Sequence, residues 1–285
     1  SIVEGQAVIS RLSGALLRAF LVVWLIATPA LLLSGGSRDA AEGVALIALF
    51  AAIIAFIEYG SEYPSLVDFR HAPPVNRLRF GAFFIIVFLL SVICRGFYDT
   101  TAITEFVTAI AGLVGHLIDF PYSPVRNMIL MLPAGADPAL LEAVRMTAGL
   151  AYLLSILAIL TIALFIRLDR WPARYGTFNV WVNLPTFDPT AGGDVVERLH
   201  RVARLNLALG FLLPFVIPAL LKIMAQTFSP LSLDAPQALI WTMAIWAFFP
   251  ASLFMRGIAM GRVARMIEDK RRQRYAEFGE EGVLV

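Results

Sequence analysis

The sequence predicts an all-α polytopic membrane protein with about six transmembrane helices, interfacial helices in the loops and both ends in the cytoplasm. Hydrophobic residues make up 59% of the 285 positions and charged residues only 15%, with a mean hydropathy of +0.77. A soluble domain carries about 25% charged residues. The charges also cluster between long uncharged runs, which is typical of segments that span hydrocarbon.

Six uncharged runs are long enough to cross a bilayer when charged groups at their ends snorkel toward water. The predicted spans cover about residues 19–37, 43–59, 79–97, 146–167, 205–222 and 235–256. The first run is longer than the roughly 7 to 15 residues of a signal-peptide core, so we expect a retained span. The whole chain, residues 1–285, then forms a single transmembrane domain.

The connection at 96–145 is expected on the non-cytoplasmic side. Its apolar run Phe106–Ile118 is too short to span the bilayer, and such runs are interfacial or re-entrant. Both alternatives stay open. Asp137 followed by Pro138 predicts the start of a further helix, because Asp caps helix N-termini and Pro suits the first turn.

The connection at 167–204 is expected in the cytoplasm. The alternation of apolar and polar residues over 178–183 favours a short strand. A basic helix then begins near Val195 and continues into the fifth span. After the last span, residues 257–285 predict a basic cytoplasmic helix and tail, because one face stays apolar while arginines line the other.

Arginine and lysine set the predicted orientation, since positively charged loops stay in the cytoplasm. With the N-terminus inside, only five of the 23 basic residues fall outside: Arg38, Arg95, Arg126, Arg145 and Lys222. All but Lys222 and Lys270 are arginines, and this bias suggests a GC-rich bacterial genome. The expected location is therefore a bacterial inner membrane.

The charge balance excludes some partners and favours others. A formal net charge of +2 gives no broad basic surface for nucleic acid. The cytoplasmic arginine clusters suit the anionic headgroups of membrane lipids. Other integral membrane proteins are the second expected class of partner.

Chemistry-bearing motifs are scarce. Cys94 is the only cysteine, and His71, His116 and His200 are scattered near predicted interfaces or loops, so we expect no bound metal, haem or other cofactor. Hydrolase, metalloprotease and nucleotide-binding motifs are missing, and we expect no enzyme. Asp68 to His71 brings together an acid, a cation and a base, but with no second titratable cluster to face it we expect a rigid turn.

Three charged residues near span ends are candidate buried or interfacial charges: Arg18, Glu58 and Lys222. Arg18 and Glu58 are expected to form a structural ion pair if their helices are neighbours. Lys222 follows Pro214 and Pro218, which kink a helix. It either snorkels to the outer interface, the favoured interpretation, or lines a polar cavity.

Six residues are candidates for helix packing or partner contact. Gly257 and Gly261 form a small-xxx-small step, and Ala48 and Ala52 share one side of the second span. Trp171 and Trp181 lie in the cytoplasmic loop, where they dip into the lipid interface or anchor a neighbouring subunit.

Two functions of different class follow as hypotheses. The first is a non-catalytic accessory, assembly or structural subunit of a larger bacterial membrane complex, for example an energy-transducing one. It is favoured by the lack of catalytic motifs and of converging polar groups within the spans. The alternative is a small transporter or channel with a proline-broken fifth span.

Overall fold

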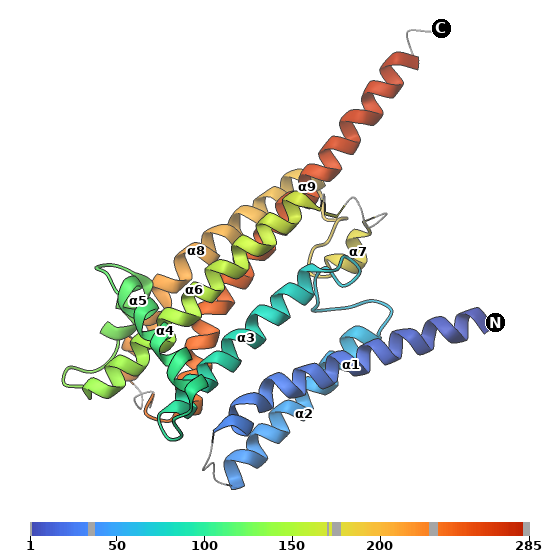
Figure 1. Cartoon of the computed structure of the whole chain (residues 1–285). Coiled ribbons are helices and arrows are strands. Elements are labelled where there is room, and N and C mark those ends of the chain that lie inside the picture. Colours follow the sequence, from blue (N-terminus) through green and yellow to red (C-terminus); the bar gives the residue numbers. More distant parts are fainter. Residues whose placement is uncertain (1, 34–37, 170, 173–177, 228–232, 282–285) are drawn as a thin grey trace.

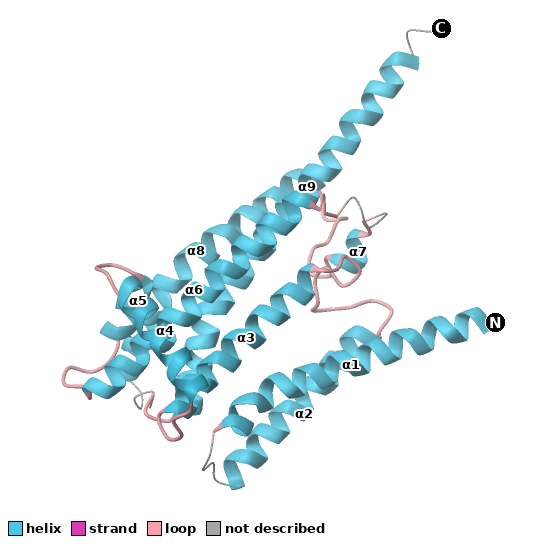
Figure 2. Cartoon of the chain, viewed as in Figure 1, coloured by secondary structure: helices cyan, strands magenta, loops and turns pink. Residues whose placement is uncertain are grey.

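The chain is an α-helical bundle, and its computed structural model describes residues 2–33, 38–169, 171–172, 178–227 and 233–281. About 80% of the protein is helical, and the described residues contain no strand (Figure 2). The helices are α1 (Ile2–Leu32), α2 (Arg38–Gly60), α3 (Val75–Gly96), α4 (Ala102–Ile118), α5 (Pro124–Leu130), α6 (Pro138–Leu168), α7 (Val180–Asn183), α8 (Val195–Thr227) and α9 (Pro236–Glu281).

Six of these helices are long and apolar enough to cross a membrane, which confirms the predicted fold class. The spanning segments are Val8–Leu32, Ala40–Gly60, Val75–Gly96, Pro138–Leu168, Val195–Ala225 and Pro236–Ala276. Residues 34–37, at the predicted end of the first span, lie outside the described residues. The start of α1, the end of α9 and the short helix α7 lie toward one end of the bundle, and α4 and α5 lie at the other (Figure 1).

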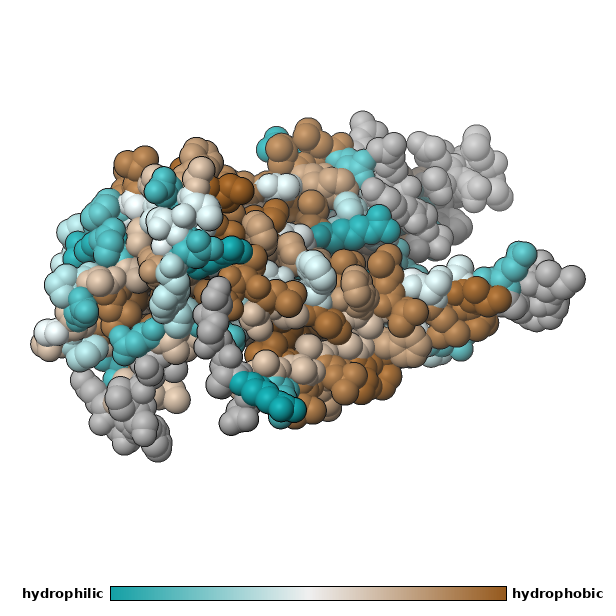
Figure 3. All heavy atoms as spheres, turned by 60° about the horizontal axis from the view of Figure 1, so that its bottom comes forward, coloured by the Kyte–Doolittle hydropathy of each residue, from teal (hydrophilic) through white to brown (hydrophobic). Residues whose placement is uncertain are grey.

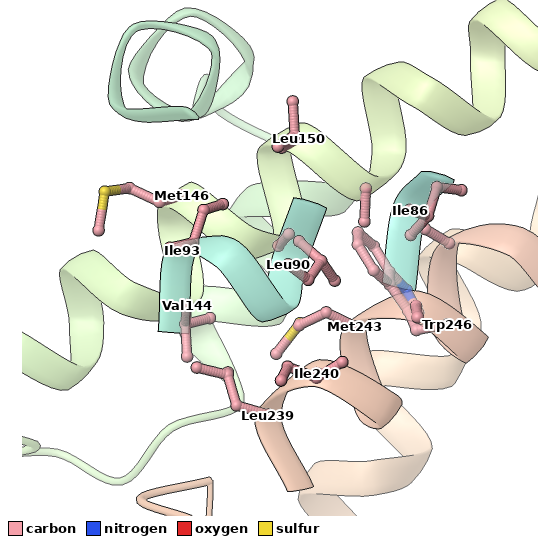
Figure 4. Close-up of a cluster of buried hydrophobic side chains, with 14 of the residues drawn as sticks. Ile86, Leu90, Ile93, Val144, Met146, Leu150, Leu239, Ile240, Met243 and Trp246 are labelled. Carbon is pink, nitrogen blue, oxygen red and sulfur yellow. The ribbon is translucent and has the colours of Figure 1, made fainter. Parts of the chain in front are cut away.

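The main core lies between α3, α6 and α9 near the α4–α5 end. Ile86 and Leu90 of α3 point toward Trp246 and Met243 of α9, while Val144 of α6 closes the cluster (Figure 4). Each of these side chains is at most 2% exposed. Because lipid is as apolar as these residues, close packing rather than exclusion from water selects this arrangement.

A second core lies near the α7 end, where loop residues cover the bundle. Phe69 and Trp171 come from two different connecting segments and pack edge-on at 5.5 Å, with Leu184 and Leu199 in the same cluster. Phe69 has a left-handed backbone, with φ of 57°. A bulky residue holds this disfavoured conformation only where its surroundings fix it.

Helices α1 and α2 form a hairpin beside the bundle (Figure 1). α1 also contacts α3, whereas α2 packs chiefly on α1. Among the described residues, the hairpin supplies the buried Leu25 and the half-buried Leu33 to the main core. In α2 only 6% of the spanning window is buried, compared with 39% in α3 and 50% in α9.

The short apolar helix α4 begins at Ala102, four residues before the predicted run. Thr101 and Thr104 form its capping box, which explains the earlier start. α4 packs closely on α6: a Cβ added at Gly149 would lie 2.6 Å from the Cα of Gly115. Its other face exposes an apolar stripe, Ile103, Phe106, Ile110, Leu113 and Leu117.

Two further helix boundaries were predicted correctly. Asp137 caps α6, with its side chain accepting a hydrogen bond from the backbone N–H of Ala139. The basic segment from Val195 is continuous with the fifth span in α8, and α9 extends well beyond Arg256.

The predicted strand over 178–183 is wrong, because residues 180–183 form the short helix α7. The side chain of Asn179 accepts from the N–H of Trp181, and the Asn183 amide donates to the carbonyl of Asn179. These local bonds satisfy the backbone, and no partner strand occurs in the described segments.

Hydrophobic residues cover much of the face seen in the space-filling view, and hydrophilic residues gather most densely at its left end (Figure 3). A broad apolar surface of this kind would be unstable in water. The surface therefore agrees with a multi-pass membrane protein.

Candidate functional site

The most densely linked polar cluster lies at the α7 end, where two loops meet α3, α8 and α9. Asp68, in the loop after α2, forms an ion pair with Arg256 of α9, and both side chains are largely buried. Arg256 also donates to Thr186 at 2.9 Å and to Asn206 of α8 at 3.4 Å. One guanidinium thus joins two loops and two spans.

Arg79 of α3 extends the same cluster. It donates to the hydroxyl of Ser252 on α9 and, at 3.5 Å, to the side chain of Asn76. Asn76 in turn donates to the carbonyl of Asp68 at 2.7 Å. The Oδ1 atom of Asp68 is buried without a hydrogen-bond partner. The carboxylate therefore depends on Arg256 for its direct compensation.

The two loops are joined by hydrogen bonds that each involve at least one main-chain group. Asn183 of α7 accepts from the N–H of Phe69 at its carbonyl and from the N–H of His71 at its side chain. Trp171 donates from Nε1 to the carbonyl of Ala72, and its own carbonyl accepts from Arg262 of α9. Trp171 is fully buried, so its contacts are all within the chain. We call residues 61–74, together with the described residues of 171–194 that include α7, the polar cap.

Glu58, near the end of α2, connects the polar cap to the α1–α2 hairpin. Its carboxylate accepts hydrogen bonds from the backbone N–H groups of Ser65, Leu66 and Val67 and from the Ser65 hydroxyl. Arg70 donates to the Glu58 carbonyl at 2.9 Å. Glu58 is only 6% exposed.

The predicted Arg18–Glu58 ion pair is therefore wrong. Arg18 instead donates to the carbonyl of Gly14 at 2.8 Å, and its guanidinium lies over the ring of Tyr59, 4.8 Å from the centroid. The helices are neighbours, as the pairing required. However, three consecutive loop N–H groups already surround the carboxylate, and hydrogen bonds to an ionised acceptor are strong.

A second ionic network lies at the α4–α5 end. The Asp119 carboxylate, whose side chain is 5% exposed, pairs with Arg126 of α5 at 2.8 Å and with Arg145 of α6 at 2.9 Å. Glu142 contacts Arg145 and, at 3.2 Å, His116 of α4. The network ties α4, α5 and α6 together, which is a structural role.

Lys222 has a local partner. Its ammonium donates to the carbonyl of Leu130, the last residue of α5, at 2.9 Å. Helix α8 contains Pro214 and Pro218, and Pro218 leaves the carbonyl of Pro214 without its helical donor. Trp246 of α9 donates to that carbonyl at 3.1 Å.

Most of the candidate packing residues contact other residues of the same chain. A Cβ at Gly257 would lie 2.8 Å from the Cγ of Leu207 and 2.9 Å from the carbonyl of Ala203, so Gly257 allows α9 to approach α8. Gly261 faces Ala203 more loosely, at 3.8 Å. Ala48 is buried and Ala52 half-buried on α2. Trp181, at 56% exposed, is the candidate that remains accessible.

Titratable groups outside the spans have modest roles. Burial, with a contribution from Arg70, lowers the pKa of His71 below its usual range. The hydrogen bond from Arg271 lowers the pKa of Asp194, which also caps α8. Across the described ranges, no three His, Cys, Asp or Glu residues group closely enough to hold a metal ion.

The fold and this arrangement define a polytopic helical membrane protein with a cross-linked polar cap at one end. Comparison with known families, curated proteins and solved structures found no match to the chain.

Proposed function

We propose that this protein is a non-catalytic accessory or structural subunit of a larger complex in a bacterial inner membrane. In this role the α1–α2 hairpin presents its lipid-side surface to the transmembrane helices of another integral membrane protein. The observation that carries the proposal is the contrast between a bundle that packs on itself and a hairpin that adds little to its core.

The exposed surface of α2 is large and apolar on more than one side. Leu46, Ile47, Phe50 and Ile57 are each at least 59% exposed. Only a narrow stripe of α2 is buried, and it includes Ala48, which is 4% exposed. In a membrane, such a surface contacts lipid or packs on another helix, and close helix packing provides the specific association.

The hairpin is also held at a defined position, which a purely lipid-facing anchor does not require. The Glu58 carboxylate receives three backbone N–H groups from the polar cap, and Arg70 bonds the last turn of α2. A pre-organised surface binds more tightly because less conformational entropy is lost on association.

Several polar groups of the spans are bonded within the chain, which favours the accessory role over the transporter alternative. Thr28, Ser91 and Thr147 are buried, and each donates to a carbonyl of its own helix. The transporter alternative was motivated by Lys222 and the proline-broken fifth span. Lys222 and the carbonyl of Pro214 are both bonded within the chain. These groups therefore do not form a hydrated path.

The test is extraction from native membranes in a gentle detergent, followed by native electrophoresis and mass spectrometry. We expect migration with a larger complex, lost in Phe50→Ala/Ile57→Ala and weakened in Trp181→Ala. Leu157→Ala/Leu160→Ala, at exposed positions of α6, is the matched control and should leave the complex intact. A lone monomer or homo-oligomer from wild-type membranes contradicts the proposal.

A further inference from the structure

Two neighbouring grooves at the arginine-rich end of the bundle share a wall on α9. The first, of about 350 Å³, lies between α6 and α9 and is lined by Ala163, Ile166, Arg167, Ile258, Arg262 and Arg265. The second, of about 300 Å³, lies between α8 and α9. Its charged or polar lining residues are His200, Arg204 and Arg265. Ile258 and Arg265 belong to both grooves.

No carboxylate lines either groove. Arg262 donates from Nε to the carbonyl of Trp171, while the guanidinium groups of Arg167, Arg204 and Arg265 form no hydrogen bond or ion pair with any described residue. The arginines predicted on the outer side are different: Arg38 pairs with Glu42, Arg95 with Asp99, and both Arg126 and Arg145 with Asp119. The positive charge of the grooves is thus left for an external anion.

The position of the grooves along the spans identifies the kind of anion. Arg167 ends the apolar part of α6, Arg204 precedes the apolar part of α8, and Arg265 follows that of α9. Below them the linings turn apolar, with Ala163 on one side and Leu207 on the other. This arrangement, with cations at headgroup depth above apolar walls, fits an amphiphile whose head carries phosphate.

We propose that these grooves form one site for an anionic phospholipid with two phosphate groups. One phosphate occupies the α6–α9 groove against Arg167 and Arg262, the other occupies the α8–α9 groove against Arg204, and Arg265 contacts both. The acyl chains lie along the apolar walls of α6 and α8. Two grooves joined by a shared arginine favour a head with two phosphates over a head with one.

The site would also fasten α9 to its neighbours at the point where the helix leaves the bundle. In this part of α9 the one ion pair to another element, among the residues that the structure describes, is the exposed pair of Arg271 with Asp194. A lipid that bridges α6, α9 and α8 supplies contacts across all three.

The test uses full-length protein in neutral detergent and native mass spectrometry with added lipids. Three probes are compared: a two-phosphate lipid of the cardiolipin class, phosphatidylglycerol with one phosphate, and zwitterionic phosphatidylethanolamine. We expect the order two phosphates, then one, then zwitterionic. Each groove cation contributes about fivefold to affinity near a membrane surface. Arg167→Gln or Arg204→Gln should therefore weaken binding of the two-phosphate lipid about fivefold, and Arg265→Gln should weaken it more than either, because Arg265 contacts both phosphates.

Arg201→Gln is the matched control, because Arg201 lies on α8 at the same end but pairs with Glu197. It removes the same charge and should leave lipid affinity unchanged. All four positions are at the surface, and unchanged melting temperatures verify that each variant folds. Equal affinity for the three lipids, or an Arg265→Gln variant that binds like wild type, overturns the proposal.

Inorganic pyrophosphate separates a lipid from a free phosphate anion as the ligand. We expect millimolar pyrophosphate to leave the two-phosphate lipid bound, because it lacks the apolar chains. Displacement of the lipid by pyrophosphate at comparable concentration would assign the grooves to a soluble anion and overturn the lipid assignment. These outcomes are independent of whether the hairpin binds a partner subunit.

Discussion

Arg256 of α9 donates from Nε to Oδ2 of Asp68, a residue 188 positions earlier in the chain, and this pair is the centre of the polar cap. Both side chains are less than a fifth exposed. Removing one partner of a buried ion pair leaves an uncompensated charge and costs about 3 kcal/mol. We therefore expect Asp68→Asn and Arg256→Gln each to reduce the free energy of unfolding by about this amount.

The measurement is unfolding of purified protein in detergent, followed by circular dichroism. The double variant Asp68→Asn/Arg256→Gln should lose less than the sum of the single variants, because no isolated charge remains. Arg38→Gln breaks a pair whose side chains are 92% and 63% exposed, and it should cost at most about 0.5 kcal/mol. Strictly additive losses at Asp68 and Arg256 would show that the pair is not coupled.

Glu58→Gln tests how the hairpin is attached. A glutamine has one acceptor oxygen in place of two, and it lacks the charge that strengthens the bonds from Ser65, Leu66 and Val67. We expect hydrogen exchange of these three amides to accelerate about tenfold. Glu62→Gln is the matched control in the same loop, since Glu62 is exposed. If these three amides exchanged as slowly in the Glu58→Gln variant as in the wild-type protein, the proposed attachment would be refuted.

The α4–α6 crossing depends on two glycines. In Gly149→Ala the new Cβ would lie 2.6 Å from the backbone of Gly115, so α4 must move away from α6. Overpacking of this kind costs about 1–3 kcal/mol. Gly43→Ala on α2 meets nothing within 4 Å and should be neutral or slightly stabilising. The comparison is made by thermal unfolding, and equal melting temperatures for the two variants would exclude a tight crossing.

Topology is tested by single cysteines in a Cys94→Ala background. Tyr122 is 88% exposed at the α4–α5 end, and Tyr63 is 72% exposed in the polar cap. From outside the cell, an impermeant thiol reagent should label Tyr122→Cys and leave Tyr63→Cys unlabelled. The opposite pattern would invert the orientation, and labelling of both would contradict the crossing of α3, the one predicted span between the two positions.

The six spans were predictable because membrane crossing depends on length and hydropathy, which are local properties of the sequence. The capping of α6 by Asp137 was predictable for the same reason. The partners of Asp68, Glu58 and Lys222 were not, because hydropathy does not determine which helices become neighbours. The signal in the sequence that could have pointed to this cluster is a polar residue within an otherwise apolar segment. Asn206 and Arg256 both show it, and they contact each other.

The interpretation of residues 178–183 failed on local chemistry. The alternation of apolar and polar residues has the period of a strand, but Asn179 and Asn183 bond the adjacent backbone and close a helical turn. Gly257 packs α9 on α8, within the range of the prediction, whereas the prediction that Trp171 meets lipid or a neighbouring subunit is wrong because the side chain is buried in its own chain. Whether such residues contact the same chain or a partner depends on tertiary structure, and here both contact the same chain.

The central claim, that the hairpin binds another membrane protein, is tested most directly by photo-crosslinking in native membranes. A photoreactive amino acid is placed at Phe50 or Ile57 of α2 and, as control, at Leu160 of α6, all exposed apolar positions. The account predicts a covalent adduct with a second polypeptide from both α2 positions and adducts with lipid alone from Leu160. Lipid adducts alone from all three positions would contradict it.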